Sequence, residues 1–321
     1  MIKIAMKTSV DYFNHLKNKQ MKRSYIITLA LTATLVSCND NAVFENEMYK
    51  NEVALISSDY HNTFQEVIHL TGEEEIEGYI AASSGGTHAP NKDMIIGLEE
   101  DPEPLAEYNW SIYDADSSLY AKLLPKDKFE IVDYEIRIKA GERTGRTMIK
   151  LRPEGLSPDS TYLIGLKATD ISGGIELNTK KSTMLYQVLL QNDYASQAED
   201  SFYTMTGLMN EGAAAANKQL FPLTYNSVRM IAGNETFEST EASIAKSSII
   251  LEVDKNNKVT IKPYKDIHVV QLDNDPLYPN LFKVEEEFGR RTNVFLLSYE
   301  YTIGGVTNVM KERVEMQVRV K

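Results

Sequence analysis

Short segments with alternating apolar and polar side chains fill the chain between residues 52 and 190. A period of two is typical of β-strands that bury one face. Turn residues separate these segments, for example at residues 83–86 and 172–174. Two of the apolar faces are formed by Tyr162, Ile164, Leu166 and Ala168, and by Met184, Tyr186, Val188 and Leu190. We therefore predict an all-β sandwich over residues 51–190, with one possible helix near residues 117–124.

The alternation resumes after a polar segment at residues 191–201, which we interpret as a linker. A possible helix at residues 211–219 precedes a predicted hairpin, in which segments 247–253 and 259–264 flank a polar turn. Near the end of the chain, Phe295, Leu297, Tyr299, Tyr301 and Ile303 share one face of a period-two pattern. We predict a second antiparallel β domain over residues 202–321, and the pattern fits a sandwich or a closed barrel equally well.

The first 37 residues have the composition of an export signal. Lys22 and Arg23 precede an apolar run at residues 25–36, which is shorter than the roughly 20 residues of a membrane-spanning helix. The run ends at Ser37 and Cys38, which resembles the site where bacterial lipoproteins are cleaved and lipidated. We predict that residues 1–37 are an upstream extension plus a lipoprotein signal peptide starting at Met21, and that Cys38 is lipidated. The alternative is a buried cysteine at the end of a short core helix.

Residues 38–50 form an acidic tether that has no basic residue before Lys50. This tether resembles the acidic export tag of Bacteroidetes lipoproteins, although any solvated linker can also be acidic. The resemblance implies a lipid-anchored protein of the outer membrane that faces the cell exterior.

Charge and cysteine content exclude several classes of protein. The chain has 34 Lys and Arg residues against 46 Asp and Glu residues, a formal net charge of −12. Nucleic-acid binding depends on basic residues that displace counterions, so we expect no nucleic-acid partner. A single Cys excludes both a disulfide scaffold and a cysteine-based zinc site.

Two sets of residues resemble a known pair of domains. The first set is Tyr108-Asn109, residues 120–125 (YAKLLP), 129–131 (FEI), 138–142 (IKAGE) and 155–159 (GLSPD), with Tyr162. It resembles the Ig-like N-terminal domain of unknown function in Bacteroidetes surface lipoproteins, which also precedes some endo-N-acetylglucosaminidase modules. The second set, residues 220–223, 278–280 and 295–301, resembles the uncharacterised β-rich domain that often follows it. The resemblance implies polysaccharide utilisation at the cell surface, with possible outer-membrane transport partners, and it supplies no catalytic residues.

The motifs of known catalytic and metal sites are missing from the sequence. The histidines at positions 61, 69, 88 and 268 lack the spacing of zinc ligands, and Asp273 and Asp275 are not followed by an oxygen-rich calcium loop. The acidic run of the related endo-glycosidases is also missing. We expect no metal, cofactor or catalytic residue, and the sequence favours a non-catalytic protein. The alternatives are a glycoside hydrolase with an unrecognised carboxylate pair and a structural or adhesin subunit.

Exposed aromatic side chains are the candidates for binding a glycan, because flat rings stack on the apolar faces of sugars. Trp110 is flanked by polar residues, and Tyr278 and Asn280 lie in a loop bounded by prolines. We predict that these three residues contact a glycan. Packing at the ends of the sandwiches is the alternative role for all three.

Overall fold

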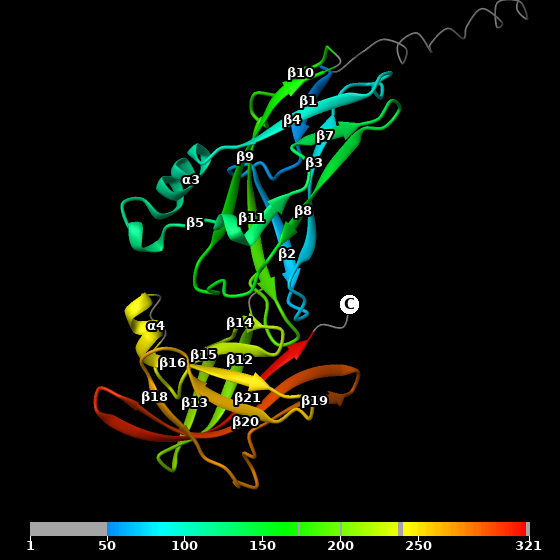
Figure 1. Cartoon of the computed structure of the whole chain (residues 1–321). Helices are drawn as coiled ribbons and strands as arrows, with labels where there is room; N and C mark the ends of the chain where they lie inside the picture. The colour runs from blue at the N-terminus through cyan, green and yellow to red at the C-terminus, as the bar shows by residue number, and fades with distance from the viewer. Residues whose placement is uncertain (1–49, 173, 200, 237–239, 319–321) are drawn as a thin grey trace, which may run out of the picture. The chain divides into compact units, whose positions relative to one another are not determined.

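A computed structural model describes residues 50–318, except residues 173, 200 and 237–239 (Figure 1). The predicted signal peptide, Cys38 and nearly all of the acidic tether lie outside the described residues. In the described part of the chain, no helix is both long and apolar enough to cross a membrane.

The N-terminal domain is a sandwich of two β-sheets, as the alternating pattern predicts. One sheet has the strand order β10-β1-β3-β8-β6, and the other has the order β2-β11-β9-β4-β7, with β5 also paired to β9. The strands are β1 (Glu52–Leu55), β2 (Thr63–His69), β3 (Ile76–Ser84), β4 (Met94–Glu100), β5 (Lys122–Leu123), β6 (Phe129–Ile131), β7 (Glu135–Ile138), β8 (Thr144–Leu151), β9 (Tyr162–Ile171), β10 (Glu176–Leu177) and β11 (Thr183–Gln191).

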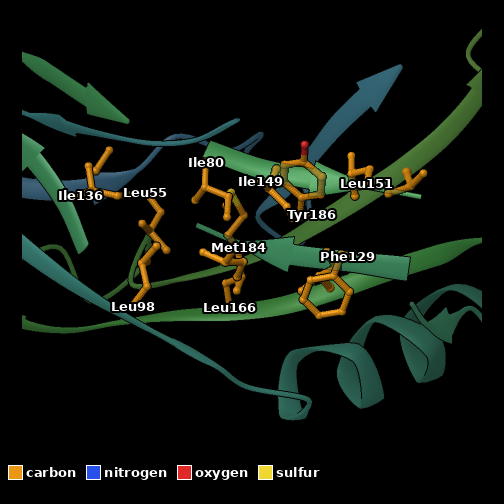
Figure 2. Packing of buried hydrophobic residues seen from close by; sticks show 14 of the residues in the cluster. Leu55, Ile80, Leu98, Phe129, Ile136, Ile149, Leu151, Leu166, Met184 and Tyr186 are labelled. Carbon is orange, nitrogen blue, oxygen red and sulfur yellow. The ribbon is translucent and has the colours of Figure 1, made fainter. Parts of the chain in front are cut away.

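Side chains from the inner faces of both sheets form one hydrophobic core (Figure 2). Ile80 and Ile149 come from one sheet, and Leu166, Met184 and Tyr186 come from the other. All five are almost completely buried. Fully burying an aliphatic side chain contributes about 1.5–3 kcal/mol, so this core is the main source of stability of the domain.

The early and late strands of this sandwich pair in parallel. β2 lies beside β11 over seven residue pairs, from Thr63 opposite Leu185 to His69 opposite Gln191. β1 likewise lies parallel to β10. The other side of β11 pairs antiparallel with β9.

The helix of this domain lies upstream of the predicted position. α3 spans Glu103–Tyr113, whereas the region of residues 117–124 holds only the 3-10 turn η1 (Ser117–Leu119) and β5. The prediction missed α3 because its inner face includes the polar Asn109, which interrupts the apolar period. A second 3-10 turn, η2 (Lys126–Lys128), precedes β6.

The C-terminal domain also consists of two sheets around one core. Its sheets have the orders β13-β12-β21-β20-β18, with β19 also paired to β20, and β14-β15-β16-β17. The elements are β12 (Phe202–Met209), β13 (Gly212–Gln219), β14 (Phe221–Thr224), β15 (Ser227–Ile231), α4 (Glu241–Ser247), β16 (Ser248–Val253), β17 (Val259–Pro263), β18 (His268–Gln271), β19 (Leu281–Glu287), β20 (Arg290–Ile303) and β21 (Val306–Val318). The predicted hairpin β16–β17 is confirmed, and β20 and β21 form a longer hairpin that reverses at Gly304-Gly305.

One prediction for this region is wrong. Residues 212–219 form strand β13 instead of a helix, because all eight residues pair antiparallel with β12 and this tertiary pairing overrides the helix propensity of the alanine run. The segment at 191–201 connects β11 to β12, and its assignment as a linker between the two domains stays a prediction. Its first residues pack against the C-terminal domain. Asn192 is buried and donates to the carbonyl oxygens of Thr224 (2.7 Å) and Ser227 (2.9 Å), and the ring of Tyr194 packs against Phe282.

Candidate binding surface

Five aromatic side chains form a continuous series on the N-terminal domain. In order they are Tyr60, His61, Tyr108, Tyr113 and Tyr120, and we call them the aromatic row. The centroid distances between successive rings are 4.5, 5.6, 6.5 and 6.4 Å. These distances are those of ring pairs in contact. The row connects the loop between β1 and β2 with α3 and with the turn that follows it.

The middle of the row is fixed by packing against a small hydrophobic cluster. Tyr108 and Tyr113 of α3 pack on four buried residues of the helix and the neighbouring strands, which are Leu105, Ala121, Leu163 and Leu185. Partial burial raises the pKa of the Tyr108 hydroxyl above its ordinary value, and the nearby Tyr113 adds to the effect. The hydroxyl group of Tyr120 donates to the carbonyl oxygen of Asp114 at 2.6 Å.

Asn109 connects α3 to the last ring of the row. Its amide nitrogen donates to the carbonyl oxygen of Ala121 at 2.9 Å, and its amide oxygen accepts from the amide nitrogen of Ala121 at 2.8 Å. Because both ends of the buried amide are used, Asn109 is a positioning residue. Asn109 therefore fixes the segment that begins at Tyr120 against α3.

The other end of the row is open to solvent. Tyr60 is 62% exposed, and it precedes His61 and Asn62, which both have positive φ angles. Asn62 anchors this turn by donating to the carbonyl oxygen of Lys180 at 2.8 Å. The row therefore presents an exposed ring on an ordered turn, which is a suitable platform for stacking a flat apolar ligand face.

The structure places the predicted Trp110 on the outer side of α3. Its side chain is 63% exposed, whereas Leu105 and Asn109 of the same helix are buried. Trp110 is therefore accessible to a ligand, and its side chain is not packed inside the sandwich. Its contact with a glycan stays a prediction.

The two predicted residues of the C-terminal domain have different surroundings. Tyr278 is half-buried in the loop before β19, next to Asp275, which accepts a hydrogen bond from the Tyr278 amide nitrogen and forms an ion pair with Lys311 at 2.7 Å. The Asp275 carboxylate raises the pKa of Lys311. A hollow of about 380 Å³ lies nearby and is lined by residues that include Leu208, Asn210 and Lys311.

Asn280 is fully buried, and it is not placed to contact a glycan. Its amide nitrogen donates to the carbonyl oxygen of Leu272, and its amide oxygen accepts from the amide nitrogen of Ser298, each at 2.8 Å. Asn280 also has a φ of 55°, a conformation that asparagine tolerates well. Its role in this structure is to hold the loop against β20, which corrects the prediction.

A buried polar cluster lies in the core of the C-terminal domain. The Lys218 ammonium is 3.3 Å from the Glu312 carboxylate, and both side chains are almost completely buried. Tyr299 donates to Glu312 at 2.6 Å and accepts from the amide nitrogen of Gly233 at 2.7 Å. Burial lowers the pKa of Lys218 and raises that of Tyr299. A Cβ atom at Gly233 would collide with the ring of Tyr301, so glycine is required there.

Arg229 of β15 forms an ion pair in which the arginine side chain is buried. Its guanidinium group is bonded to Asp159, which also accepts from the hydroxyl of Tyr264 at 2.9 Å. The guanidinium lies 4.0 Å from the centre of the Phe221 ring, in cation–π geometry. Burial and the neighbouring Asp159 raise the pKa of Tyr264 to about 12. Asp159 is the last residue of the GLSPD segment of this sequence.

The buried carboxylates of these described residues are already engaged. Glu312 holds Lys218 and Tyr299, and the half-buried Glu66 accepts from the hydroxyl of Tyr186 at 3.0 Å. Desolvation raises the pKa of Glu66. Across the part of the chain that the structure describes, no group of three or more His, Cys, Asp or Glu residues is positioned to hold a metal ion.

Sequence reasoning missed most of the aromatic row. Tyr60, His61 and Tyr113 were not singled out, because no local pattern distinguishes them from structural residues. The feature of the composition that points to an aromatic surface is the number of tyrosines, which is 18 against one tryptophan. Only the fold brings Tyr60 together with Tyr108.

Comparison with protein families identifies the two domains. A family model described as an N-terminal domain matches residues 44–175, and one described as a C-terminal domain matches residues 182–317. The chain belongs to the family that combines these two domains, which confirms the resemblance of both domains, whereas the lipoprotein part of the resemblance stays a prediction. The match to the C-terminal domain begins just before β11, a strand that completes a sheet of the N-terminal sandwich. No curated protein matches the chain.

Several solved structures share this two-domain fold. A protein of unknown function from Bacteroides ovatus is 12% identical with a TM-score of 0.61, and the match covers 83% of this chain and 94% of that chain. A second protein of unknown function from the same organism is 13% identical with a TM-score of 0.60, covering 87% and 94%. An auxiliary nutrient binding protein from Bacteroides thetaiotaomicron is 13% identical with a TM-score of 0.56, covering 82% and 94%. At these identities the similarity establishes the fold.

Proposed function

We propose that the protein is a non-catalytic, lipid-anchored protein of the outer cell surface that binds glycan for a polysaccharide-utilisation system. The observation that carries the proposal is the aromatic row, which ends in an exposed ring on an ordered turn. The fold shared with a protein described as an auxiliary nutrient binding protein supports the same role. Outer-membrane transport proteins are the proposed partners, to which captured saccharide would pass.

The test of this proposal is glycan binding by the chain from residue 39, which retains every described residue. Tyr60→Ala and Trp110→Ala are each expected to weaken binding of a neutral oligosaccharide. An aromatic contact contributes about 0.5–1.5 kcal/mol beyond burial, so we expect losses of roughly 2- to 13-fold in affinity. A glycan array would select the ligand, and isothermal titration would measure the affinities.

Phe288 provides a matched control, because it is fully exposed on the hairpin between β19 and β20. Phe288→Ala is expected to leave the affinity unchanged. Full affinity in both the Tyr60 and Trp110 variants would contradict the aromatic platform. Steady release of reducing ends from the bound glycan, abolished by one carboxylate substitution, would favour the hydrolase alternative instead.

The anchor at Cys38 has its own test, in cells that process lipoproteins. The membrane-extracted protein is expected to lack residues 1–37 and to carry the additional mass of acyl chains at Cys38, because the apolar run ends there. Cys38→Ala is expected to shift the protein out of the membrane fraction. A Cys38→Ala protein that is still membrane-anchored would contradict the lipid anchor.

A further inference from the structure

A hollow of about 510 Å³ lies on the outer face of the N-terminal sandwich, and none of its lining residues belongs to the aromatic row. Its lining includes Tyr79, Arg137, Glu142, Thr144 and Arg146. Two guanidinium groups and one carboxylate therefore line the hollow. The net charge of these lining side chains is positive, although the net charge of the whole chain is −12.

The strands of one sheet present the tyrosine and one arginine to the hollow. On β8, the neighbours Thr147 and Ile149 are buried, so the alternation directs Arg146 outward. Tyr79 projects from the adjacent strand β3 and is 39% exposed. The Arg146 guanidinium lies 5.9 Å from the centre of the Tyr79 ring. Phe64 packs edge-to-face behind Tyr79 at 5.6 Å, which restrains that ring.

The second arginine is brought to the same hollow by a close approach of two strands. Arg137 is exposed on β7, which the turn at residues 139–143 connects to β8. A Cβ atom at Gly145 would collide with the backbone carbonyl of Arg137, so only glycine allows this approach. The close backbone contact between Gly145 and Arg137 therefore shapes the hollow together with the side chains that line it.

Neither arginine has an acidic partner among the residues that the structure describes. Arg137 and Arg146 form no ion pair with a described carboxylate, whereas Arg152, Arg229 and Arg313 each bind one. Guanidinium groups bind planar or tetrahedral oxyanions through paired hydrogen bonds. Two such groups beside an exposed ring form a recognition site for an anion that also has an apolar face.

We infer that this hollow binds an acidic sugar residue, one that bears a carboxylate or a sulfate group. Arg137 and Arg146 bind the oxyanion, and Tyr79 contacts the sugar ring. The inference rests on the proposed function for the saccharide part of the ligand. It adds a second site, on the β3–β8 face, and an acidic class of saccharide that this site would bind.

The experiment measures binding of four probes of similar length to the chain from residue 39. The probes are an oligogalacturonide, a sulfated chondroitin oligosaccharide, a neutral xylo-oligosaccharide and a single-stranded oligothymidylate. We expect at least one of the two acidic saccharides to bind, with an affinity that falls as salt is raised from 50 to 500 mM. Which one binds distinguishes the carboxylate from the sulfate.

The variants connect binding to the hollow. Arg137→Gln combined with Arg146→Gln is expected to weaken binding of the acidic saccharide at least tenfold, and Tyr79→Ala is expected to weaken it several-fold. Arg290→Gln, at an exposed arginine of β20, is the matched control and should have no effect. Unchanged melting temperatures would show that the variants are folded.

Three results would overturn the inference. They are a lack of binding by both acidic saccharides, equal affinity in the double-arginine variant, and binding of oligothymidylate as tight as that of the acidic saccharide. The proposed function is tested separately, because it depends on the effect of Tyr60→Ala and Trp110→Ala on the neutral saccharide. Loss of neutral binding in those variants, with no acidic binding, would leave the proposed function standing and remove this inference.

Discussion

Glu312→Ala is expected to lower the free energy of unfolding of the C-terminal domain by about 3–5 kcal/mol, the typical cost of breaking a buried ion pair. The Lys218 and Glu312 side chains are only 3% and 0% exposed, and one carboxylate oxygen of Glu312 lies 3.3 Å from the Lys218 ammonium as an ion pair without a hydrogen bond. Removing the carboxylate leaves the ammonium buried without its counter-charge, and it also removes the acceptor of the Tyr299 hydroxyl. Denaturant-induced unfolding would measure the change.

An exposed pair is the control for this experiment. Lys262 and Glu252 form an ion pair at 2.6 Å but are 47% and 42% exposed, so Glu252→Ala should cost less than about 1 kcal/mol. The double variant Lys218→Met, Glu312→Leu should recover most of the loss, because it removes both buried charges. If Glu312→Ala cost no more than Glu252→Ala, the ion pair would not be the reason for the stability of this core.

Asp159→Ala is expected to destabilise the chain by a similar amount, about 3–5 kcal/mol. The substitution removes the carboxylate that compensates the fully buried Arg229 guanidinium and accepts from the Tyr264 hydroxyl. The Nε atom of Arg229 already has no hydrogen-bond partner among the described residues, so the loss of Asp159 would leave the group with few contacts beyond Ser248 and the Phe221 ring. Thermal unfolding followed by circular dichroism would detect the change.

A double-mutant cycle would separate the ion pair from the packing around it. Arg229→Met keeps much of the side-chain volume, so combining it with Asp159→Ala should cost clearly less than Asp159→Ala alone. Strictly additive effects of the two substitutions would show that no coupling exists, and they would contradict the assigned pair.

The alternation of side chains predicted most of the strands correctly. β9, β11 and β20 carry apolar side chains at alternate positions that face the cores, and this alternation identified them as strands. The structure also buries residues on their other face, such as Leu163 and Leu185 beneath α3. The pattern predicted the wrong element where a contact with another segment of the chain determines the secondary structure. Strand β13 consists largely of alanine, and only its pairing with β12 makes it a strand. Helix α3 has a polar residue on its inner face, because Asn109 is needed to bind the backbone of Ala121.

The candidate sites were less predictable than the fold. Trp110 could be singled out from its polar neighbours, and its exposure agrees with that reasoning. Asn280 could not be recognised as buried, because its amide is satisfied by Leu272 and Ser298, and the second of these lies 18 residues away. The aromatic row and the arginine hollow both join residues from separate strands and loops, so their members have no shared signature in the sequence.

The parallel pairing of β2 with β11 has a consequence for how the N-terminal domain folds. Gln65 and Gln187, which bond across this pair, are 122 residues apart in the chain. Contacts of such long range are entropically costly to close and slow the formation of a native topology. β2 can therefore pair with β11 only after β11, the last strand of this sheet in chain order, has been synthesised. Until then, the backbone groups of β2 that bond to β11 in the folded domain have no partner in that strand. A nascent or truncated chain that ends before Thr183 would expose this edge to other molecules, and Glu66, an acidic residue directed inward from β2, is the type of residue that limits edge-to-edge aggregation.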